Sequence, residues 1–335
     1  MNSNFEISIV IPCFNAAGTI IKTINSLMAQ TYKKFECIII DDHSVDSTMT
    51  IVNEFISNDY RFSIMLRNTK NKGGSVCRNQ GLKASTGKYI MFLDADDFVS
   101  PNCLEDRINN MKENPALDFG VFNTAIIGKR TMLLTRYSKD PLRDFLIGCY
   151  PWQTMSPLWK RSFLLKINGF NEIFPRLQDV EIHTRALLFN GVVYKYFPLS
   201  KTDSFYNFSR SKEVNIDKIK KQITGYILYL EQTLMMIKDE KYKKYLKRTY
   251  YLLISILDEI PSDSNLQLRI IKIEKNLELS NIEKIKIDLF KSLNKHKIFN
   301  KHIIFELLFF NFNRILNYLS KILSSNNYNK LLWRD

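Results

Sequence analysis

The chain has 335 residues and a net charge of +14, with 45% hydrophobic and 24% charged residues. This is ordinary globular composition, sufficient for one large hydrophobic core or two modest ones, and it excludes an intrinsically disordered chain. The five cysteines are odd in number and contain no C-x-x-C pair, which argues against a disulfide framework or a zinc site and favours reduced thiols in the cytoplasm.

Strands and helices alternate through the first hundred residues. The β-branched run from Ile7 to Pro12 predicts a first strand with no secretory leader before it, and apolar residues at helical spacing predict a helix from Thr19. The same patterns predict strands at Phe35 to Ile40, Ser63 to Leu66 and Tyr89 to Leu93, and helices after Ser47, after Gly73 and from Asn102 to Asn114. This alternation predicts an α/β fold built from parallel βαβ units.

Polar or aromatic side chains follow three of these strands. They are Phe14 and Asn15 after the first strand, Asp41 and Asp42 after the second, and Asp94, Asp96 and Asp97 after the fourth. Ligands of open α/β sheets bind beyond the carboxyl ends of the strands, so these side chains are expected to surround one ligand.

The acidic segment Asp94 to Asp97 has two interpretations. Three carboxylates close together are costly to bury without a cation, and hard oxygen ligands suit Mg²⁺ or Mn²⁺. The alternative is an acidic turn without a metal, which is common in proteins. Neither the G-x-G-x-x-G turn nor the G-x-x-x-x-G-K-[ST] loop is present, so a nucleotide here would be held by carboxylates and metal.

Several motifs follow one another in the first part of the chain. They are P-C-F-N (Pro12 to Asn15), S-L-M-A-Q-T-Y (Ser26 to Tyr32), F-E-C-I-I-I-D-D-H-S-x-D-S-T (Phe35 to Thr48), N-K-G-G-S-V-C-R-N-Q-G (Asn71 to Gly81) and G-K-Y-I-M-F-L-D-A-D-D (Gly87 to Asp97). Over about the first 200 residues, the chain with these motifs resembles the family 2 glycosyltransferases of GT-A fold. The resemblance implies a GT-A fold, with a mostly parallel central sheet flanked by helices, and a nucleotide-sugar donor site.

The resemblance also implies roles for individual residues. Pro12, Phe14 and Asn15 would line the donor site, Asp42 would contact the nucleobase, and Arg78 would lie near the base or the phosphates. Asp94 and Asp96 would form the D-x-D pair that holds Mn²⁺ or Mg²⁺, with Asp96 as the direct ligand. Asp97 would shape the loop or contact the sugar.

A second group of candidates lies on the acceptor side. Trp152 either stacks on an acceptor sugar or fills the core. Asp179 opens a predicted helix, where a carboxylate is favourable in any case, but the resemblance makes it the catalytic base. Gln178 replaces the usual Glu of the family's Glu-Asp pair. Glu181 is placed on the acceptor side as the rival base, and His183 is expected to be an ordinary helix histidine.

The resemblance implies an inverting, metal-dependent transfer of one sugar from a nucleoside-diphosphate sugar, with UDP as carrier, to a glycan or lipid-linked acceptor in surface polysaccharide synthesis. Two alternatives stay open. One is a sugar-phosphate nucleotidyltransferase, although the segment from Cys13 to Gly18 lacks a basic residue. The other is an inactive sugar-binding or scaffold protein.

The chain after residue 200 is basic and helical. From Lys201 onward it has 25 Lys and Arg against 15 Asp and Glu, and helices are predicted at Ile216 to Met236 and Tyr242 to Leu257. An amphipathic helix from Lys295 to Leu323 would either contact an anionic membrane or pack on the catalytic domain. No uncharged apolar run is long enough to span a membrane, and no nucleic-acid-binding motif accompanies the charge.

We therefore expect a catalytic domain at residues 1–205, with a nucleotide-sugar half at 1–115 and an acceptor half at 116–205. A basic helical region would follow at 206–335. The protein would be cytoplasmic, either free or peripheral on the inner face of the cell membrane.

Overall fold

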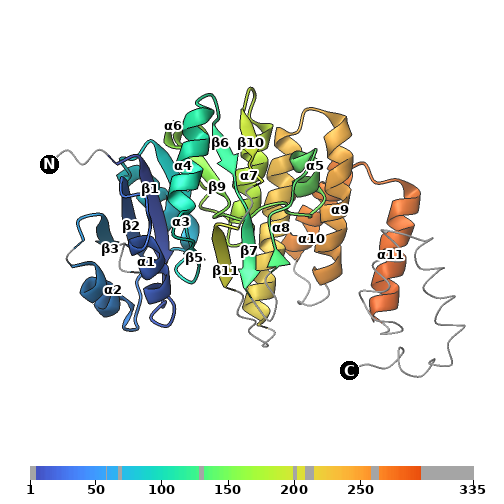
Figure 1. The fold of residues 1–335 in the computed structure, drawn as a ribbon. Helices are drawn as coiled ribbons and strands as arrows, with labels where there is room; N and C mark the ends of the chain where they lie inside the picture. Colours follow the sequence, from blue (N-terminus) through green and yellow to red (C-terminus); the bar gives the residue numbers. More distant parts are fainter. Residues whose placement is uncertain are drawn as a thin grey trace, which may run out of the picture. The chain divides into compact units, whose positions relative to one another are not determined.

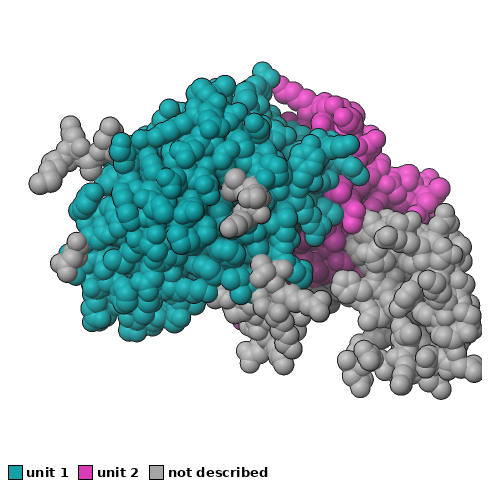
Figure 2. All heavy atoms as spheres, viewed as in Figure 1, with its two compact units in different colours: residues 1–145, 149–213 teal, residues 146–148, 214–335 magenta. Residues whose placement is uncertain are grey.

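The structure is a computed structural model that describes residues 5–57, 59–66, 70–127, 132–198, 202–207, 215–257 and 264–295. The chain forms two compact units, shown in two colours in Figure 2. Unit 1 comprises residues 1–145 and 149–213, and unit 2 comprises residues 146–148 and 214–335. The functional division at residue 205 stays a prediction. The predicted membrane-binding or packing helix lies, after Lys295, outside the described residues.

The core of unit 1 is a seven-stranded sheet (Figure 1). Its strands are β1 (Ile7–Cys13), β2 (Phe35–Asp41), β3 (Phe62–Leu66), β4 (Tyr89–Phe92), β6 (Phe119–Val121), β9 (Pro157–Lys160) and β10 (Tyr194–Tyr196), in the order β10-β6-β9-β4-β1-β2-β3. Only β9 runs antiparallel to its neighbours among these paired strands. The predicted α/β class with a mostly parallel sheet is confirmed.

Helices cover both faces of this sheet. They are α1 (Ile20–Met28), α2 (Thr48–Ile56), α3 (Gly74–Ala84), α4 (Cys103–Glu113), α5 (Pro141–Leu146), α6 (Arg161–Lys166) and α7 (Gln178–Leu188). Apolar residues of α1, α2 and α4 form one buried cluster with Ile9 and Met91 of the sheet. On the opposite face α3 lies so close to β1 that a Cβ at Gly81 would come within 2.2 Å of Val10 Cγ1. Gly81 therefore permits the helix that carries Arg78 to approach the sheet.

Strand β9 departs from the predicted pattern. The segment around it contains prolines and tryptophans and lacks strand alternation, yet residues 157–160 insert between β4 and β6. Trp159 is 1% exposed and lies opposite Ile90 on one side and Phe119 on the other. Insertion buries this large ring in the sheet, which local sequence preference alone does not reveal.

A second sheet of four short strands lies in unit 1 and was not predicted. Its strands are β5 (Phe98–Val99), β7 (Thr124–Ile127), β8 (Met132–Leu133) and β11 (Ser204–Asn207), in the order β5-β11-β7-β8. Each strand has two to four residues, so its apolar pattern is too short to recognise, and β11 pairs with partners about 80 to 100 residues earlier in the chain.

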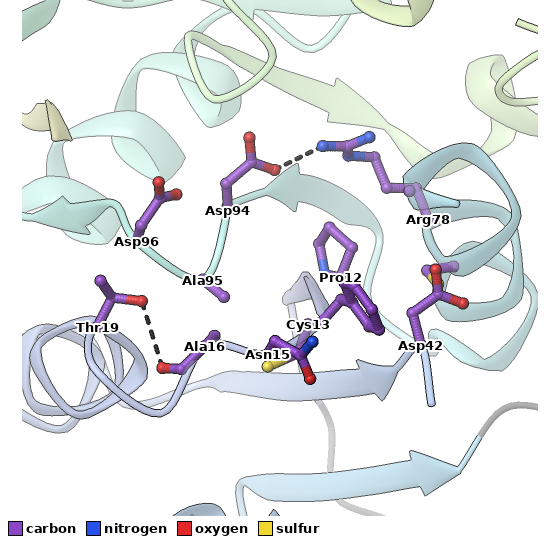
Figure 3. A pocket seen from close by; sticks show the side chains of 13 residues that line it. Pro12, Cys13, Asn15, Ala16, Thr19, Asp42, Arg78, Asp94, Ala95 and Asp96 are labelled. Atoms are coloured by element: carbon purple, nitrogen blue, oxygen red, sulfur yellow. Dashed lines mark hydrogen bonds and ion pairs between the residues drawn. The ribbon is translucent and has the colours of Figure 1, made fainter. Parts of the chain in front are cut away.

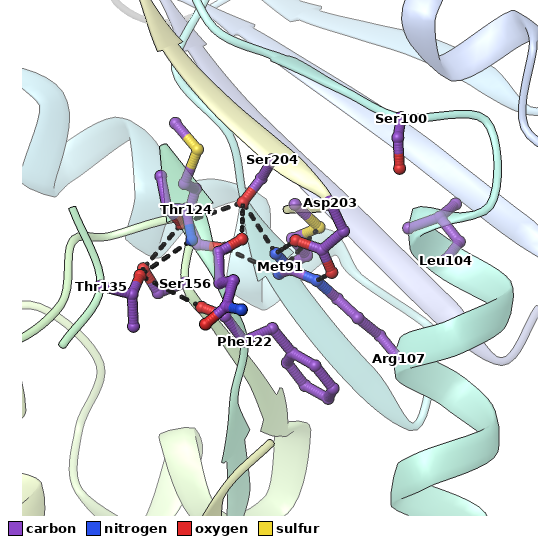
Figure 4. A network of polar contacts seen from close by, with 12 residues as sticks. Met91, Ser100, Leu104, Arg107, Phe122, Thr124, Thr135, Ser156, Asp203 and Ser204 are labelled. Atoms are coloured by element: carbon purple, nitrogen blue, oxygen red, sulfur yellow. Dashed lines mark hydrogen bonds and ion pairs between the residues drawn. The ribbon is translucent and has the colours of Figure 1, made fainter. Parts of the chain in front are cut away.

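A buried polar network joins α4 to this second sheet (Figure 4). The Arg107 guanidinium donates to both carboxylate oxygens of Asp203 at 2.7 Å, to the Met155 carbonyl at 2.7 Å and to Ser204 Oγ at 3.0 Å. Ser204 Oγ also lies 2.9 Å from Thr124 Oγ1 of β7. Because Arg107 is fully buried, its charge is compensated by these partners, and the network fixes β11 to α4.

The described helices of unit 2 are α8 (Ile216–Met236), α9 (Glu240–Leu257), α10 (Ser264–Asn276) and α11 (Asn281–Lys295). The bounds of α8 match the prediction, and α9 begins two residues earlier than predicted. Ile227 of α8 and Leu253 of α9 are fully buried, as expected for packed amphipathic helices. Within the described ranges, no helix combines the length and the apolar character needed to cross a membrane.

Removal of the buried cation should destabilise unit 1. We expect Arg107→Ala to lower the free energy of unfolding by about 3–5 kcal/mol, because it leaves the buried Asp203 carboxylate without its partner. Lys112→Ala is the matched control on the same helix: Lys112 is 48% exposed and pairs with Glu6, so its loss should cost about 1 kcal/mol or less. Urea unfolding followed by circular dichroism measures both, and equal losses would contradict the buried role of Arg107.

Candidate active site

A cavity of about 420 Å³ lies at the carboxyl ends of β1 and β4, where the first strand-to-helix loop meets the acidic loop (Figure 3). It is lined by Pro12, Cys13, Phe14, Asn15, Ala16, Thr19, Asp42, Gly74, Cys77, Arg78, Asp94, Ala95 and Asp96. Every residue predicted for the donor site is among them. The structure thus brings these residues together, while their individual roles stay predictions.

The loop after β1 supplies one wall of the cavity. Asn15 has a left-handed backbone (φ 49°), and its side-chain oxygen accepts a hydrogen bond from the Val45 N–H at 2.9 Å. Its own N–H donates to Ser44 Oγ at 3.0 Å, so Asn15 ties the first loop to the loop after β2. Phe14 stays 48% exposed, which leaves its ring accessible for stacking on a planar ligand.

Asp42 lies at the end of the cavity away from Asp96 (Figure 3). Its carboxylate, in a residue that is 3% exposed, accepts hydrogen bonds from the backbone N–H groups of Lys72 at 3.1 Å and Gly73 at 2.8 Å. Gly73 has φ +94°, a conformation that favours glycine, and it directly precedes α3. Asp42 therefore fixes the start of the helix that carries Arg78, a structural role in addition to the predicted base contact.

Arg78 connects the two sides of the site. Its Nη2 donates to Asp94 Oδ1 at 2.5 Å, and its guanidinium carbon lies 5.3 Å from the centre of the Phe170 ring. Arg78 is 8% exposed, and its Nε is buried with no hydrogen-bond partner in the described part of the protein. A positive charge at a cavity wall is suited to attract an anionic ligand.

Asn79 and Phe170 are parts of the site that the sequence analysis missed. The Asn79 side chain accepts from the Phe170 N–H at 2.8 Å and donates to the Phe170 carbonyl at 2.8 Å. These bonds hold the Phe170 ring between Arg78 and Phe92, whose ring it meets edge to face at 5.0 Å. Only two sequence signals pointed to them: Asn79 directly follows Arg78, and Phe170 belongs to the G-F-N-E segment at residues 169–172.

The acidic loop after β4 is held from α1. Thr23 is fully buried, and its hydroxyl lies 3.0 Å from the Ala95 carbonyl oxygen and 2.7 Å from that of Asp97. These contacts fix the loop so that Asp94 and Asp96 face the cavity, whereas Asp97 is 1% exposed. Thr23 stands in an ordinary helical pattern, so nothing in the sequence marked it.

The two D-x-D carboxylates fit a divalent cation as part of a larger ligand set. Burial raises the pKa of Asp96, and the adjacent charge of Asp94 raises it further. No salt bridge within the described ranges reaches Asp96, so it is the carboxylate that lacks a compensating cation. No group of three or more His, Cys, Asp or Glu suited to a metal occurs among the described residues. The donor diphosphate and water would have to supply the other ligands.

Asp179 reaches the same site from α7. It follows Leu177, whose left-handed backbone (φ 62°) ends the preceding loop, and it lies in the first turn of the helix. Burial raises the pKa of Asp179, the Val180 N–H and the charge of Arg78 lower it, and the charge of Asp94 raises it. Asp179 is not among the residues that line the cavity, but the charges of two lining residues, Arg78 and Asp94, act on its carboxylate. The net result is a carboxylate that accepts a proton more readily than an exposed one.

The two residues predicted for the acceptor side lie in the interior. Glu181 is 2% exposed, and both of its carboxylate oxygens accept from Arg185, at 2.6 Å and 2.9 Å. Trp152 is 3% exposed and packs edge to face on Phe145, with ring centres 5.1 Å apart. These positions favour a structural role for Glu181 and the core interpretation for Trp152, because an acceptor sugar cannot stack on a covered ring.

His183, which the sequence predicts to be an ordinary helix histidine, is packed in the core. It is 1% exposed and stacks on Trp159 with ring centres 5.7 Å apart. Burial lowers the pKa of His183 to about 3, so the ring is neutral at physiological pH. It therefore takes no part in proton transfer at the site.

Comparison with known proteins agrees with this geometry. A family model described as "Glycosyl transferase family 2" matches residues 8–173, a range that holds the entire donor cavity. The poly(ribitol-phosphate) beta-N-acetylglucosaminyltransferase TarP of Staphylococcus aureus is 40% identical over 226 residues, covering 64% of this chain and 67% of that protein. This chain belongs to glycosyl transferase family 2. It is a glycosyltransferase.

Other relatives of this glycosyltransferase support the same family. The GalNAc(5)-diNAcBac-PP-undecaprenol beta-1,3-glucosyltransferase of Campylobacter jejuni is 28% identical over 71% of this chain and 78% of its own length. A crystal structure of S. aureus TarS 1-349 in complex with UDP-GlcNAc has a TM-score of 0.63 at 17% identity, covering 82% of this chain and 80% of that one. The structural likeness establishes the shared GT-A fold.

The raised pKa of Asp179 predicts a cost to stability at neutral pH. Its folded-state pKa lies above the unfolded value of 3.8, so ionisation of this carboxyl destabilises the fold as the pH rises through that range. We expect Asp179→Asn to raise the Tm at pH 7, by roughly 2–4 °C for each kcal/mol gained. The gain should shrink as the pH falls and vanish below about pH 3, where the wild-type carboxyl is protonated in both states. Thermal unfolding of both proteins between these pH values tests this, and a lower Tm for the variant at pH 7 would contradict it.

Proposed function

We propose that this glycosyltransferase moves one sugar from a nucleoside-diphosphate sugar, with UDP as the carrier, to a hydroxyl group of a glycan or lipid-linked acceptor. We propose further that it is inverting and metal-dependent. The observation that carries the proposal is one cavity that gathers Arg78 and the D-x-D carboxylates, together with the action of the Arg78 and Asp94 charges on Asp179.

The donor would bind along the cavity from Asp42 to Asp96. Phe14 offers an exposed ring for the nucleobase, and Asp42 lies where a base N–H or a ribose hydroxyl could donate to it. Arg78 would then face the diphosphate with its positive charge. This order along the cavity leaves the sugar beside Asp94, Asp96 and Asp179.

Asp179 would act as the general base. It accepts the proton of the acceptor hydroxyl, whose oxygen attacks the anomeric carbon as the nucleoside diphosphate departs from the opposite face. One in-line displacement inverts the anomeric centre. The raised pKa of Asp179 brings its basicity closer to that needed for proton transfer near neutral pH.

Asp96, with Asp94, would hold Mg²⁺ or Mn²⁺. When bound, the ion supplies positive charge that stabilises the leaving diphosphate. Asp94 is already paired with Arg78, so its negative charge is shared between that cation and the metal site, whereas Asp96 is the carboxylate committed to the ion.

Relatives support the proposed substrate classes. The name of the Campylobacter relative specifies a polyprenyl-diphosphate-linked acceptor, and that of TarP a poly(ribitol-phosphate) acceptor. An Escherichia coli relative, 38% identical over 151 residues, is named as a UDP-Glc-dependent glucosyltransferase acting on a diphosphoundecaprenol acceptor. We therefore place this transferase in bacterial surface polysaccharide synthesis.

Donor screening tests this proposal. Purified protein is incubated with a panel of nucleotide sugars and Mn²⁺, and release of the nucleoside diphosphate is measured. We expect Asp179→Asn to lower kcat by about 10²–10⁴-fold with little change in donor affinity, because only proton transfer is lost. Glu113→Gln, an exposed carboxylate on α4, serves as the control and should keep wild-type activity.

Three other results would change the assignment. Full activity of Asp179→Asn would move the base role to another residue. Turnover only with a sugar phosphate and a nucleoside triphosphate would indicate a nucleotidyltransferase, and donor binding without any turnover would indicate a sugar-binding scaffold.

Metal removal provides a separate test. We expect EDTA to abolish turnover of the wild type and Mn²⁺ or Mg²⁺ to restore it, because Asp94 and Asp96 alone provide too few ligands to retain the ion tightly. Asp96→Asn should weaken Mn²⁺-dependent nucleotide binding by at least about tenfold, as measured by titration calorimetry with and without metal. Metal-independent binding and turnover in the wild type would refute the metal assignment.

A further inference from the structure

A pair of tyrosines lies at the end of β10. The Tyr137 ring packs on the Tyr196 ring with ring centres 5.7 Å apart, and Tyr137 is 68% exposed. Tyr196 is the last residue of β10, and its hydroxyl donates to Asn123 Oδ1 at 2.6 Å. Asn123 is buried and follows β6. Asn123 therefore fixes the supporting ring of the pair, and Tyr137 is the member that stays open to solvent.

The pair lies on the same edge of the main sheet as the donor cavity. Strand β10 pairs parallel with β6, and β9 runs antiparallel to both β6 and β4, so β10 and β4 run in the same direction. Tyr196 at the end of β10 and the acidic loop after β4 are therefore both at the carboxyl edge. This is the edge at which ligands of open α/β sheets bind.

Helix α7, which carries the proposed base, covers the face of the sheet on which Tyr196 lies. The His183 ring of α7 lies 5.9 Å from the Trp152 ring, and the Tyr194 ring of β10 lies 6.5 Å from the same ring. Tyr194 and Tyr196 are two residues apart in one strand, so their side chains share one face. Tyr196 is therefore on the α7 side of the sheet.

The start of α7 and the end of β10 reach the same level along the strands. His183 stacks on Trp159, which the pairing of β9, β6 and β10 places level with Tyr194. Asp179 comes four residues before His183, about 6 Å along the helix, and Tyr196 comes two residues after Tyr194, about 7 Å along the strand. Because the short link of residues 189–193 makes α7 run opposite to β10, both steps lead to the carboxyl edge.

The tyrosine pair and the base are thus neighbours on one face of the sheet. Strand β6 alone separates β9, on which α7 packs, from β10, so the sideways separation is about 10 Å. One acceptor glycan can reach both Asp179 and the tyrosine pair.

An exposed aromatic ring beside the base is suited to bind a sugar. The faces of a pyranose ring carry C–H groups, and packing them on an aromatic ring removes apolar surface of both from water. A single exposed aromatic residue is common on protein surfaces and does not indicate a site by itself. Here, however, Tyr137 lies on a second ring that Asn123 fixes, so the binding surface is ordered before a ligand arrives.

The donor does not account for Tyr137. Four aromatic residues of unit 1 are well exposed in the part of the chain that the structure describes: Phe14, Phe55, Tyr60 and Tyr137. Phe14 lines the donor cavity, whereas Tyr137 is not among the lining residues. Tyr137 is therefore available to the acceptor.

We propose that the Tyr137 ring, supported by Tyr196, binds a pyranose ring of the acceptor glycan by stacking. This inference rests on the proposed function. It assigns the acceptor a binding surface at the end of β10, which the buried Trp152 ring cannot provide. The surface positions the acceptor beside Asp179 and has no part in binding the donor.

Tyr137→Ala tests this contact. Methyl α- and β-glycosides of glucose, galactose, N-acetylglucosamine and N-acetylgalactosamine are titrated into protein saturated with UDP and Mg²⁺, and binding is followed by saturation-transfer difference NMR. We expect the wild type to bind at least one glycoside through its ring C–H groups, and Tyr137→Ala to bind it roughly tenfold more weakly. Tyr137→Phe keeps the ring and should keep the wild-type affinity. The Tm and the affinity for UDP should be unchanged in both variants, because Tyr137 is exposed and outside the donor cavity.

Tyr60→Ala is the matched control. Tyr60 is 80% exposed and stacks on Phe5 with ring centres 6.2 Å apart, so it is also an exposed tyrosine supported by a second ring. It precedes β3 and therefore lies at the amino edge of the sheet, away from the site. We expect this variant to bind the glycosides as the wild type does.

The possible results are distinguishable. Unchanged glycoside binding by Tyr137→Ala, or no binding of any glycoside by the wild type, overturns the inference and leaves the proposed function intact. Equal losses in Tyr137→Ala and Tyr60→Ala also overturn it, because they would indicate nonspecific contact with exposed rings. A wild type that releases no nucleoside diphosphate from any donor refutes the proposed function, and with it the acceptor assignment, even if Tyr137 binds a sugar.

Discussion

The electrostatic balance around Arg78 is the constraint on which the site depends. The buried Arg78 guanidinium pairs with Asp94 at 2.5 Å and also lowers the pKa of Asp179, which comes 85 positions after Asp94 in the chain. Without this cation, carboxylates from the acidic loop and from α7 would repel one another at short range. Arg78 is therefore the cation that offsets the negative charge of the acidic loop and of Asp179 together.

Much of the surrounding structure serves to hold Arg78 in place. Asp42 fixes the start of α3, Gly81 allows α3 to lie against β1, and Asn79 positions the Phe170 ring beside the guanidinium. These contacts all come from main-chain hydrogen bonds or close packing, which are rigid. The charged group is thus pre-organised before a ligand binds, and little ordering remains to be done when the diphosphate arrives.

The second sheet is held directly after the acidic loop. The buried pair of Arg107 and Asp203 joins α4 to the start of β11, and β11 pairs with β5, the strand that follows the acidic loop. Buried ion pairs contribute little net stability compared with apolar packing, but a mispaired arrangement is strongly disfavoured. Arg107 consequently selects one position for β11 among those that its four residues could adopt.

Local sequence patterns were sufficient to predict the structure where strands and helices alternate regularly. Apolar periodicity predicted the parallel strands and helices of the first hundred residues and the bounds of α8, and the carboxyl-end rule grouped the residues that line the donor cavity. Those predictions depend on neighbours in sequence or on a general property of parallel sheets, so a single chain contains the necessary information.

The amino-acid sequence by itself determined the family motifs, the α/β class, and the types and spacing of the charged groups at the strand ends. Only the tertiary structure decided which of the later residues reach the site. It brought Asp179 within reach of the charges of Arg78 and Asp94, and it buried Glu181 and Trp152, for which the sequence had left an acceptor contact open. The physical reason is that the side chains of α7 and the second sheet are positioned by pairings between segments far apart in the chain. The free energy of such pairings depends on packing and charge compensation in three dimensions, and no local pattern encodes it.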